Sequence, residues 1–183
     1  VRCALPMRDV LSVAAGAGAI GWIAEGGLRR MGPQAASSKP GPGGCGLGGE
    51  QPACTDADLV LGYLDPDYFA GGKMKLDKAA AEKAIEEKIA KPLGFTMVQA
   101  AAGMYDVINV NMASAVREVA VNHGQDPRDF PMVVAGGAGP NHACRIALEL
   151  EIPTLLVPRE SSIFCAAGML MSELQHDFVR SYP

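Results

Sequence analysis

The chain has 183 residues, of which 49% are hydrophobic and 20% are charged, a composition typical of a globular protein with a sizeable core. The formal net charge of -4 gives no basic surface for nucleic acid, so we expect no nucleic-acid partner. The five cysteines are scattered and form no C-x-x-C pair, which favours a reducing cytoplasm over a disulfide framework.

Residues 10–24 carry no charge and follow Arg2 and Arg8, which raises the question of a signal peptide or a membrane span. The run is shorter than the roughly 20 residues that a span needs. It is also interrupted by glycines and has Asp9 at its start. We therefore expect neither a signal peptide nor a membrane contact. Because the chain opens on Val1 without an obvious start signal, we expect it to begin within a longer protein.

Strands and an irregular segment are predicted in the first third of the chain. Residues 9–31 predict two or three strands, the last pair joined by a turn at residues 25–27. Residues 32–52 are so rich in Gly and Pro that they cannot form a regular element. They are either a linker or a long ordered loop. Their low content of Ser and charge favours an ordered, packed loop.

A short helix is predicted to start near Cys54, with Thr55 or Asp56 as its N-cap. Cys54, Asp56 and Asp58 could together ligate a metal, because thiolates and carboxylates are metal ligands. No nearby residue in the sequence completes the coordination sphere. Capping explains two of these three residues without a metal, so capping is the favoured interpretation.

Two long helices are predicted in the middle of the chain. Asp77 is expected to cap the first, residues 78–91, whose charges lie opposite one apolar stripe. The second runs over about residues 96–123. Its small and flexible apolar side chains recur at three- and four-residue spacing, which predicts close packing in the core.

The second helix also carries polar side chains, namely Asn109, Asn111 and Arg117. They could line a nucleotide cleft. From the residues alone, we expect them to face solvent.

A strand, a glycine turn and a helix are predicted in succession over residues 130–150. The turn consists of four residues: Gly136, Gly137, Ala138 and Gly139. Glycine allows positive φ and leaves room for a ligand to reach the backbone, while the first N–H groups of the helix attract phosphate or sugar oxygens. The local pattern fits a tight turn and a ligand cradle equally well.

Residues 152–158 predict a further strand, which makes a parallel crossover unit and hence an α/β sheet. Residues 161–174 predict an apolar helix, and residues 176–182 a closing strand. His176 and Asp177 would point to opposite faces of that strand, so a base-and-orienter pair is disfavoured. A nicotinamide-type dinucleotide fold is also disfavoured, because the glycine turn lacks the third glycine and the later acidic residue at the expected spacing.

Taken together, these segments resemble the hydantoinase A / 5-oxoprolinase / acetone carboxylase family. The resemblance covers nearly the whole chain in the family's order. It rests on residues 9–22, 25–33, 40–49, 52–62, 65–72, 111–117, 126–128 and 136–143. At residues 16–19 this chain reads Gly-Ala-Gly-Ala where the family often has a Gly-Gly-Gly-Ser-like run, so a hydroxyl contact is not expected there.

The resemblance implies a partial ribonuclease H-like α/β lobe, of the type found in actin, sugar kinases and Hsp70. The chain would divide into strands and a Gly/Pro-rich loop (residues 1–62), a helical part (residues 63–125) and an α/β part (residues 126–183). The glycine turn would be the adenosine motif, packed against base and ribose. Asn111 would lie on a helix near the same cleft.

The resemblance also implies chemistry. Such enzymes use ATP with Mg²⁺ to phosphorylate an amide or carbonyl oxygen, so the expected substrate is a hydantoin, 5-oxoproline, another lactam or a ketone. A hydantoinase B-type partner subunit is expected. The family's amino-terminal phosphate loops of Asp-Gly-Gly-Thr type are not found in these 183 residues. We therefore expect the carboxy-terminal half of a hydantoinase A-type subunit, with little or no ATPase activity alone. The alternative is a non-catalytic subunit retained for assembly.

Overall fold

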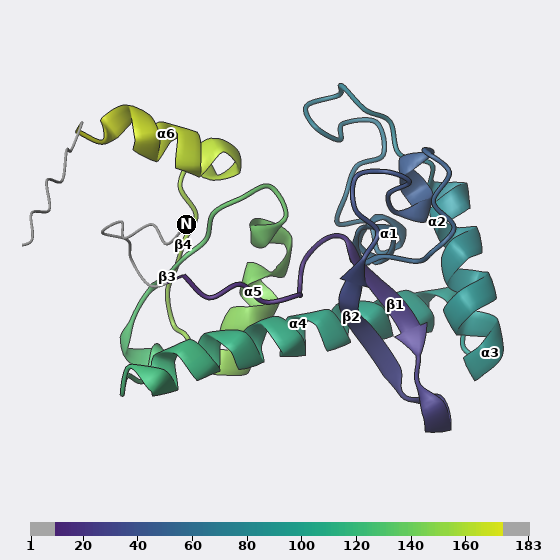
Figure 1. The fold of residues 1–183 in the computed structure, drawn as a ribbon, viewed down its shortest axis with the longest axis horizontal. Coiled ribbons are helices and arrows are strands. Elements are labelled where there is room, and N and C mark those ends of the chain that lie inside the picture. Colours follow the sequence, from purple (N-terminus) through teal and green to yellow (C-terminus); the bar gives the residue numbers. More distant parts are fainter. Residues whose placement is uncertain (1–9, 174–183) are drawn as a thin grey trace, which may run out of the picture.

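A computed structural model describes residues 10–173 of the chain (Figure 1). This part is a mixed α/β structure with two small sheets of two strands each. The strands are β1 (Ala19–Ile23), β2 (Arg29–Ala35), β3 (Met132–Val133) and β4 (Leu155–Leu156). The α-helices are α1 (Cys54–Val60), α2 (Lys78–Ile85), α3 (Lys91–Leu93), α4 (Met97–Asn122), α5 (Gly139–Leu150) and α6 (Phe164–Met171).

The first sheet is an antiparallel hairpin of β1 and β2. The connection is a 3-10 turn over Glu25–Gly27, in which Gly26 and Gly27 take φ of 78° and 80°. Such φ values strain residues with a side chain, which explains the Gly-Gly pair. The predicted hairpin is confirmed, with two strands rather than three. Strand β2 continues to Ala35, so the expectation that residues 32–52 form no regular element is wrong for residues 32–35. Pro33 is tolerated there because both strands of a two-stranded ribbon are edge strands.

The rest of the Gly/Pro-rich segment is an ordered loop, as predicted. Residues 41–44 are buried and include the start of a 3-10 turn at Gly43–Cys45. A Cβ at Gly44 would lie only 3.1 Å from Leu59 Cδ2 and 3.2 Å from Ala81 Cβ. Glycine therefore allows the loop to pack directly onto α1 and α2.

The predicted N-cap of α1 is wrong. Ala53 occupies the cap position, and Asp56 is the third residue of the helix. Its carboxylate reaches back to accept the Ala53 N–H at 2.7 Å, which is the second half of a capping box. Thr55 instead donates its hydroxyl to Ala17 O at 2.9 Å and so ties α1 to the segment before β1.

Both predicted long helices are present. Asp77 caps α2 by accepting the Ala80 N–H at 3.0 Å. The helix then continues through a π-helical turn at Glu86–Ala90 into α3. Helix α4 begins with a reciprocal capping box in which Thr96 and Gln99 accept each other's backbone N–H.

Helix α4 connects the two parts of the structure, with the hairpin and α1 to α3 beside its first half and α5, β3 and β4 beside its second half (Figure 1). Each part has its own apolar core. The first includes Met104 and Ile108 of α4, and the second includes Ala113 of α4 with Ile146 and Leu150 of α5.

The predicted parallel crossover is confirmed. Strands β3 and β4 pair in parallel, Met132 with Leu155, and α5 lies between them in sequence. Both strands are shorter than predicted. The predicted last helix is a 3-10 turn at Ser161–Ile163 followed by α6. The closing strand predicted at residues 176–182, with His176 and Asp177, lies outside the described residues. Within residues 10–173, every helix is too short or too polar to cross a membrane.

Candidate functional site

The glycine turn lies where β3 ends and α5 begins. Gly136 takes φ of +92°, and its N–H donates to Ser161 O at 2.7 Å. This bond joins the loop after β3 to the loop after the parallel strand β4. In open α/β sheets, ligands bind outside the carboxyl ends of such strands.

The glycines of the turn have different environments. A Cβ at Gly137 would meet nothing within 4 Å, whereas a Cβ at Gly139 would lie 3.3 Å from Val134 Cγ1. The N–H groups of Gly137 and Ala138 form no hydrogen bond to another residue that the structure describes. Gly139 thus allows close helix–strand packing, while Gly137 is exposed and Ala138 half-buried, each with an N–H that is unpaired within the described part of the chain. The structure therefore supports the packing interpretation for Gly139, and a ligand cradle at Gly137 and Ala138 stays a prediction.

Asn111 lies elsewhere. It is exposed on α4, and its Nδ2 donates to Met31 O of the hairpin at 3.4 Å. It lines a cavity of about 650 Å³ together with Trp22 and Arg30, and none of the glycine-turn residues lines that cavity. The structure does not bring Asn111 and the glycine turn together in one cavity, so a shared role remains a prediction.

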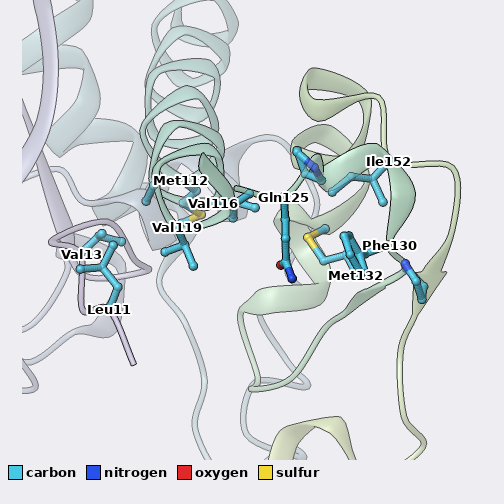
Figure 2. Close-up of a pocket in the computed structure, with 13 residues that line it drawn as sticks. Leu11, Val13, Met112, Val116, Val119, Gln125, Phe130, Met132 and Ile152 are labelled. Atoms are coloured by element: carbon cyan, nitrogen blue, oxygen red, sulfur yellow. The ribbon is translucent and has the colours of Figure 1, made fainter. Parts of the chain in front are cut away.

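A second cavity, of about 460 Å³, lies beside the carboxy-terminal half of α4 (Figure 2). Its lining is apolar except for Gln125. It comprises Leu11, Val13, Met112, Ala115, Val116, Val119, Ala120, Gln125, Pro127, Phe130, Pro131, Met132 and Ile152. Among residues 10–173, its lining includes no titratable group, so these residues can contact an apolar molecule but supply no acid or base for catalysis.

A buried polar cluster lies at the first turn of α5. Cys54 and Asp58 are one helical turn apart on α1, and His142 faces them from α5. Cys54 Sγ lies 3.8 Å from Asp58 Oδ2 and 3.6 Å from His142 Nε2, and the latter two atoms are 3.5 Å apart. The side chains of Asp58 and His142 are only 2% and 1% exposed, and Cys54 is fully buried.

Asn109 fixes the orientation of the imidazole. Its Nδ2 donates to Tyr105 O at 2.7 Å, so its Oδ1 is the atom 3.2 Å from His142 Nδ1. An amide oxygen only accepts, so Nδ1 carries a proton and Nε2 is turned toward Cys54 and Asp58. The Tyr105 ring stacks on the imidazole at 5.2 Å, and its hydroxyl donates to Asn141 O at 2.8 Å.

The cluster has unusual electrostatics. Burial, and next the negative charge of Asp58, raise the pKa of the Cys54 thiol well above its usual range. Without a cation, the thiol is therefore protonated. Asp58 Oδ1 is buried and has no hydrogen-bond partner among the described residues. Because these groups are closed to solvent and the thiol is neutral, they are unsuited to act as a nucleophile on a substrate.

The sequence interpretation missed this cluster in two ways. Capping holds for Asp56 but not for Asp58, which faces Cys54 and His142. Asn109, expected to face solvent, is buried and 1% exposed. The missing member, His142, lies 88 residues from Cys54, so only the fold brings them together. The available signal was the position of His142, three residues after Gly139 in the first turn of the predicted helix.

The sequence profile described as Hydantoinase/oxoprolinase matches residues 1–178. The chain belongs to this family. Among curated relatives, it is 39% identical to caprolactamase subunit alpha of Pseudomonas jessenii over 182 residues, which is 100% of this chain and 26% of that protein. It is 43% identical to the acetophenone carboxylase gamma subunit of Aromatoleum aromaticum over 176 residues, 96% of this chain and 24% of that protein. The chain thus spans about a quarter of these relatives.

Solved structures agree with this membership in the hydantoinase/oxoprolinase family. The ATP-dependent caprolactamase of Pseudomonas jessenii matches with a TM-score of 0.82 and 40% identity, over 91% of this chain and 24% of that one. The nucleotide-free structure of acetone carboxylase matches with a TM-score of 0.77 and 33% identity, over 84% of this chain and 22% of that one. The predicted family is therefore confirmed.

Proposed function

We propose that this hydantoinase/oxoprolinase chain is part of a subunit that activates an amide or carbonyl oxygen by ATP-dependent phosphorylation. The relatives support this class, since they are named as a caprolactamase subunit, carboxylase subunits and 5-oxoprolinases. The proposed substrates are cyclic amides, such as hydantoins and lactams, or ketones. On an amide, phosphorylation of the oxygen activates the carbonyl carbon, so that water adds, the ring C–N bond breaks and inorganic phosphate is released. On a ketone, it gives an enol phosphate, whose carbon is carboxylated as the P–O bond breaks and phosphate is released.

The observation that carries the proposal is the open glycine turn. At the carboxyl edge of a parallel strand pair, the N–H groups of Gly137 and Ala138 have no partner among residues 10–173, and a Cβ at Gly137 would meet nothing within 4 Å. These features suit the base and ribose end of ATP in a ribonuclease H-like lobe. The phosphate and Mg²⁺ contacts are assigned to parts of the enzyme outside this chain, since phosphoryl transfer needs cationic groups that the turn does not offer.

Nucleotide binding to Gly137→Asp tests this assignment. The added carboxylate would occupy the open side of the turn and repel a nucleotide. We expect adenosine nucleotides to bind the 183-residue chain and the variant to lose at least about tenfold in affinity. The matched control is Gly16→Asp, because a Cβ there also meets nothing within 4 Å. Equal binding by wild type and Gly137→Asp, in calorimetry, would remove the turn from the nucleotide site.

A role in assembly is supported by a separate observation. Helix α6 exposes adjacent apolar side chains, with Leu170 89% and Met171 85% exposed. Single exposed apolar residues are common, but a row of them on one helix suits a protein contact. A hydantoinase B-type subunit is the proposed partner. If the chain binds no nucleotide but forms a stable complex with such a subunit, assembly becomes its function.

A further inference from the structure

The Cys54, Asp58 and His142 side chains present three different metal-ligand atoms to one point. In a tetrahedral zinc site with bonds of about 2.0–2.3 Å, neighbouring ligand atoms lie roughly 3.3–3.6 Å apart. The separations here are 3.5 Å, 3.6 Å and 3.8 Å. We propose that these three residues bind a divalent metal ion of the zinc type, in a site separate from the Mg²⁺ of ATP.

Asn109 gives the imidazole the tautomer that a metal needs. Its amide oxygen accepts the Nδ1 proton of His142 at 3.2 Å, which leaves the Nε2 lone pair directed at the other two ligands. Metal-binding histidines commonly donate their second N–H to such a partner, which orients the ring and makes it a stronger ligand. Tyr105 holds Asn109 from the other side by accepting its Nδ2–H.

The charges of the cluster also fit a divalent cation. A thiolate and a carboxylate together carry two negative charges, and burying them without a counter-charge is costly. A divalent ion neutralises both, and the Cys54 proton leaves to solvent when the metal binds. Asp58 Oδ1 is buried and has no hydrogen-bond partner within residues 10–173, which supports the same conclusion, because such an atom in a native structure calls for an ion or a water beside it.

The donor set selects the kind of metal. Mg²⁺ and Ca²⁺ prefer oxygen ligands only, whereas a sulfur, a nitrogen and an oxygen suit Zn²⁺ or Co²⁺. Three protein ligands leave the fourth tetrahedral position to a water molecule. Because all three ligands are closed to solvent, a substrate does not reach that position, so we assign the ion a structural role. It joins α1 of the first core to α5 of the second, at the helix turn that follows Gly139. The metal thereby stabilises the base of the glycine turn.

Cobalt substitution tests the site in the complete 183-residue chain without ATP, so the result is independent of the proposed nucleotide site. We expect one Co²⁺ per chain, a thiolate-to-cobalt charge-transfer band, the d–d bands of tetrahedral cobalt, and displacement by Zn²⁺. If a metal that is already bound exchanges too slowly for Co²⁺ to replace it, elemental analysis of the purified chain detects it, with one Zn²⁺ per chain expected. A folded wild-type chain that contains no metal and gives no thiolate band overturns the proposal.

Variants assign the band to its ligand. Cys54→Ala should abolish it, and the control Cys144→Ala should keep it, because Cys144 is exposed on the same α5 that carries His142. Circular dichroism checks that the variants fold. If Cys54→Ala does not fold, Asp58→Asn replaces it, with at least about a tenfold loss of Co²⁺ affinity expected. A charge-transfer band that persists in folded Cys54→Ala overturns the site. So does a Co²⁺ affinity of Asp58→Asn that equals that of the wild type.

Discussion

Asp56 and Gly44 are joined by a buried hydrogen bond of 2.7 Å, from the Gly44 N–H to the Asp56 carboxylate. The same carboxylate accepts the N–H of Gly43 at 3.1 Å and of Ala53 at 2.7 Å. One side chain thus holds the Gly/Pro-rich loop and the start of α1 together. This explains why a loop so rich in glycine is ordered.

Replacing Asp56 should therefore strongly lower the stability of the fold. Asp56→Ala leaves three buried backbone donors without an acceptor, and we expect the free energy of unfolding to fall by about 3 kcal/mol or more. Urea unfolding measures this. The control is Asp65→Ala, because the Asp65 side chain is exposed and, within residues 10–173, its carboxylate accepts one hydrogen bond, from the Asp67 N–H at 2.9 Å. A similar effect of the two changes would refute the role given to Asp56.

Gly44 itself should not tolerate a side chain. A Cβ there would lie 3.0 Å from Asp56 Oδ1 and 3.1 Å from Leu59 Cδ2. Gly44→Ala must displace the loop from α1, so we expect a loss of about 1–3 kcal/mol in the free energy of unfolding. Gly16→Ala is the matched control, since its Cβ meets nothing within 4 Å. Unchanged thermal stability of Gly44→Ala would show that the loop is not closely packed.

Local sequence patterns predicted where most helices and strands occur. The apolar spacing predicted both long helices, Asp77 was predicted as the cap of the first, and the Gly-rich turn predicted the strand-to-helix junction before α5. These signals are local, since each depends on residues within one or two helical turns. The ends of the β-strands were less predictable, because pairing between distant segments decides where a strand stops.

The buried polar cluster could not be predicted in the same way. Cys54 and Asp58 are neighbours on a helix, but His142 and Asn109 come from two other helices. Asn109 shows the difficulty clearly. It is a polar residue on a long helix, and it is buried where α5 packs against α4 and His142 contacts its side chain. Tertiary contacts over long sequence separations decide such burial, and local patterns do not contain them.

Helix α4 should depend on its buried face. Ile108 is fully buried in the first core, so Ile108→Ala removes apolar contacts and leaves a cavity. We expect a loss of about 2–5 kcal/mol in the free energy of unfolding. Val110→Ala on the same helix is the control, because Val110 is 46% exposed and should cost well under half as much. Comparable losses in urea unfolding would place the core elsewhere.

Asp126 provides a test by pH. Its carboxylate accepts side-chain hydrogen bonds from Arg128, the shortest at 2.6 Å, as well as the Arg128 backbone N–H at 3.0 Å. These bonds, followed by the charge of Arg128, lower the pKa of Asp126 to about 2. Because the folded pKa lies below the unfolded one, the pair contributes stability above the unfolded pKa of about 3.9. That contribution is lost as the pH falls through about 2.

We expect carboxyl NMR to give a titration midpoint for Asp126 near 2 in the wild type. Arg128→Gln removes the guanidinium donors and the positive charge, so the midpoint should rise toward the ordinary value of about 3.9. The pair is exposed, hence salt should also raise the wild-type midpoint by screening. Glu151→Gln is the control, because Glu151 contacts Arg128 at 3.6 Å without contributing to the bonds on Asp126. A wild-type midpoint near 3.9 would show that the Asp126–Arg128 pair does not form in solution.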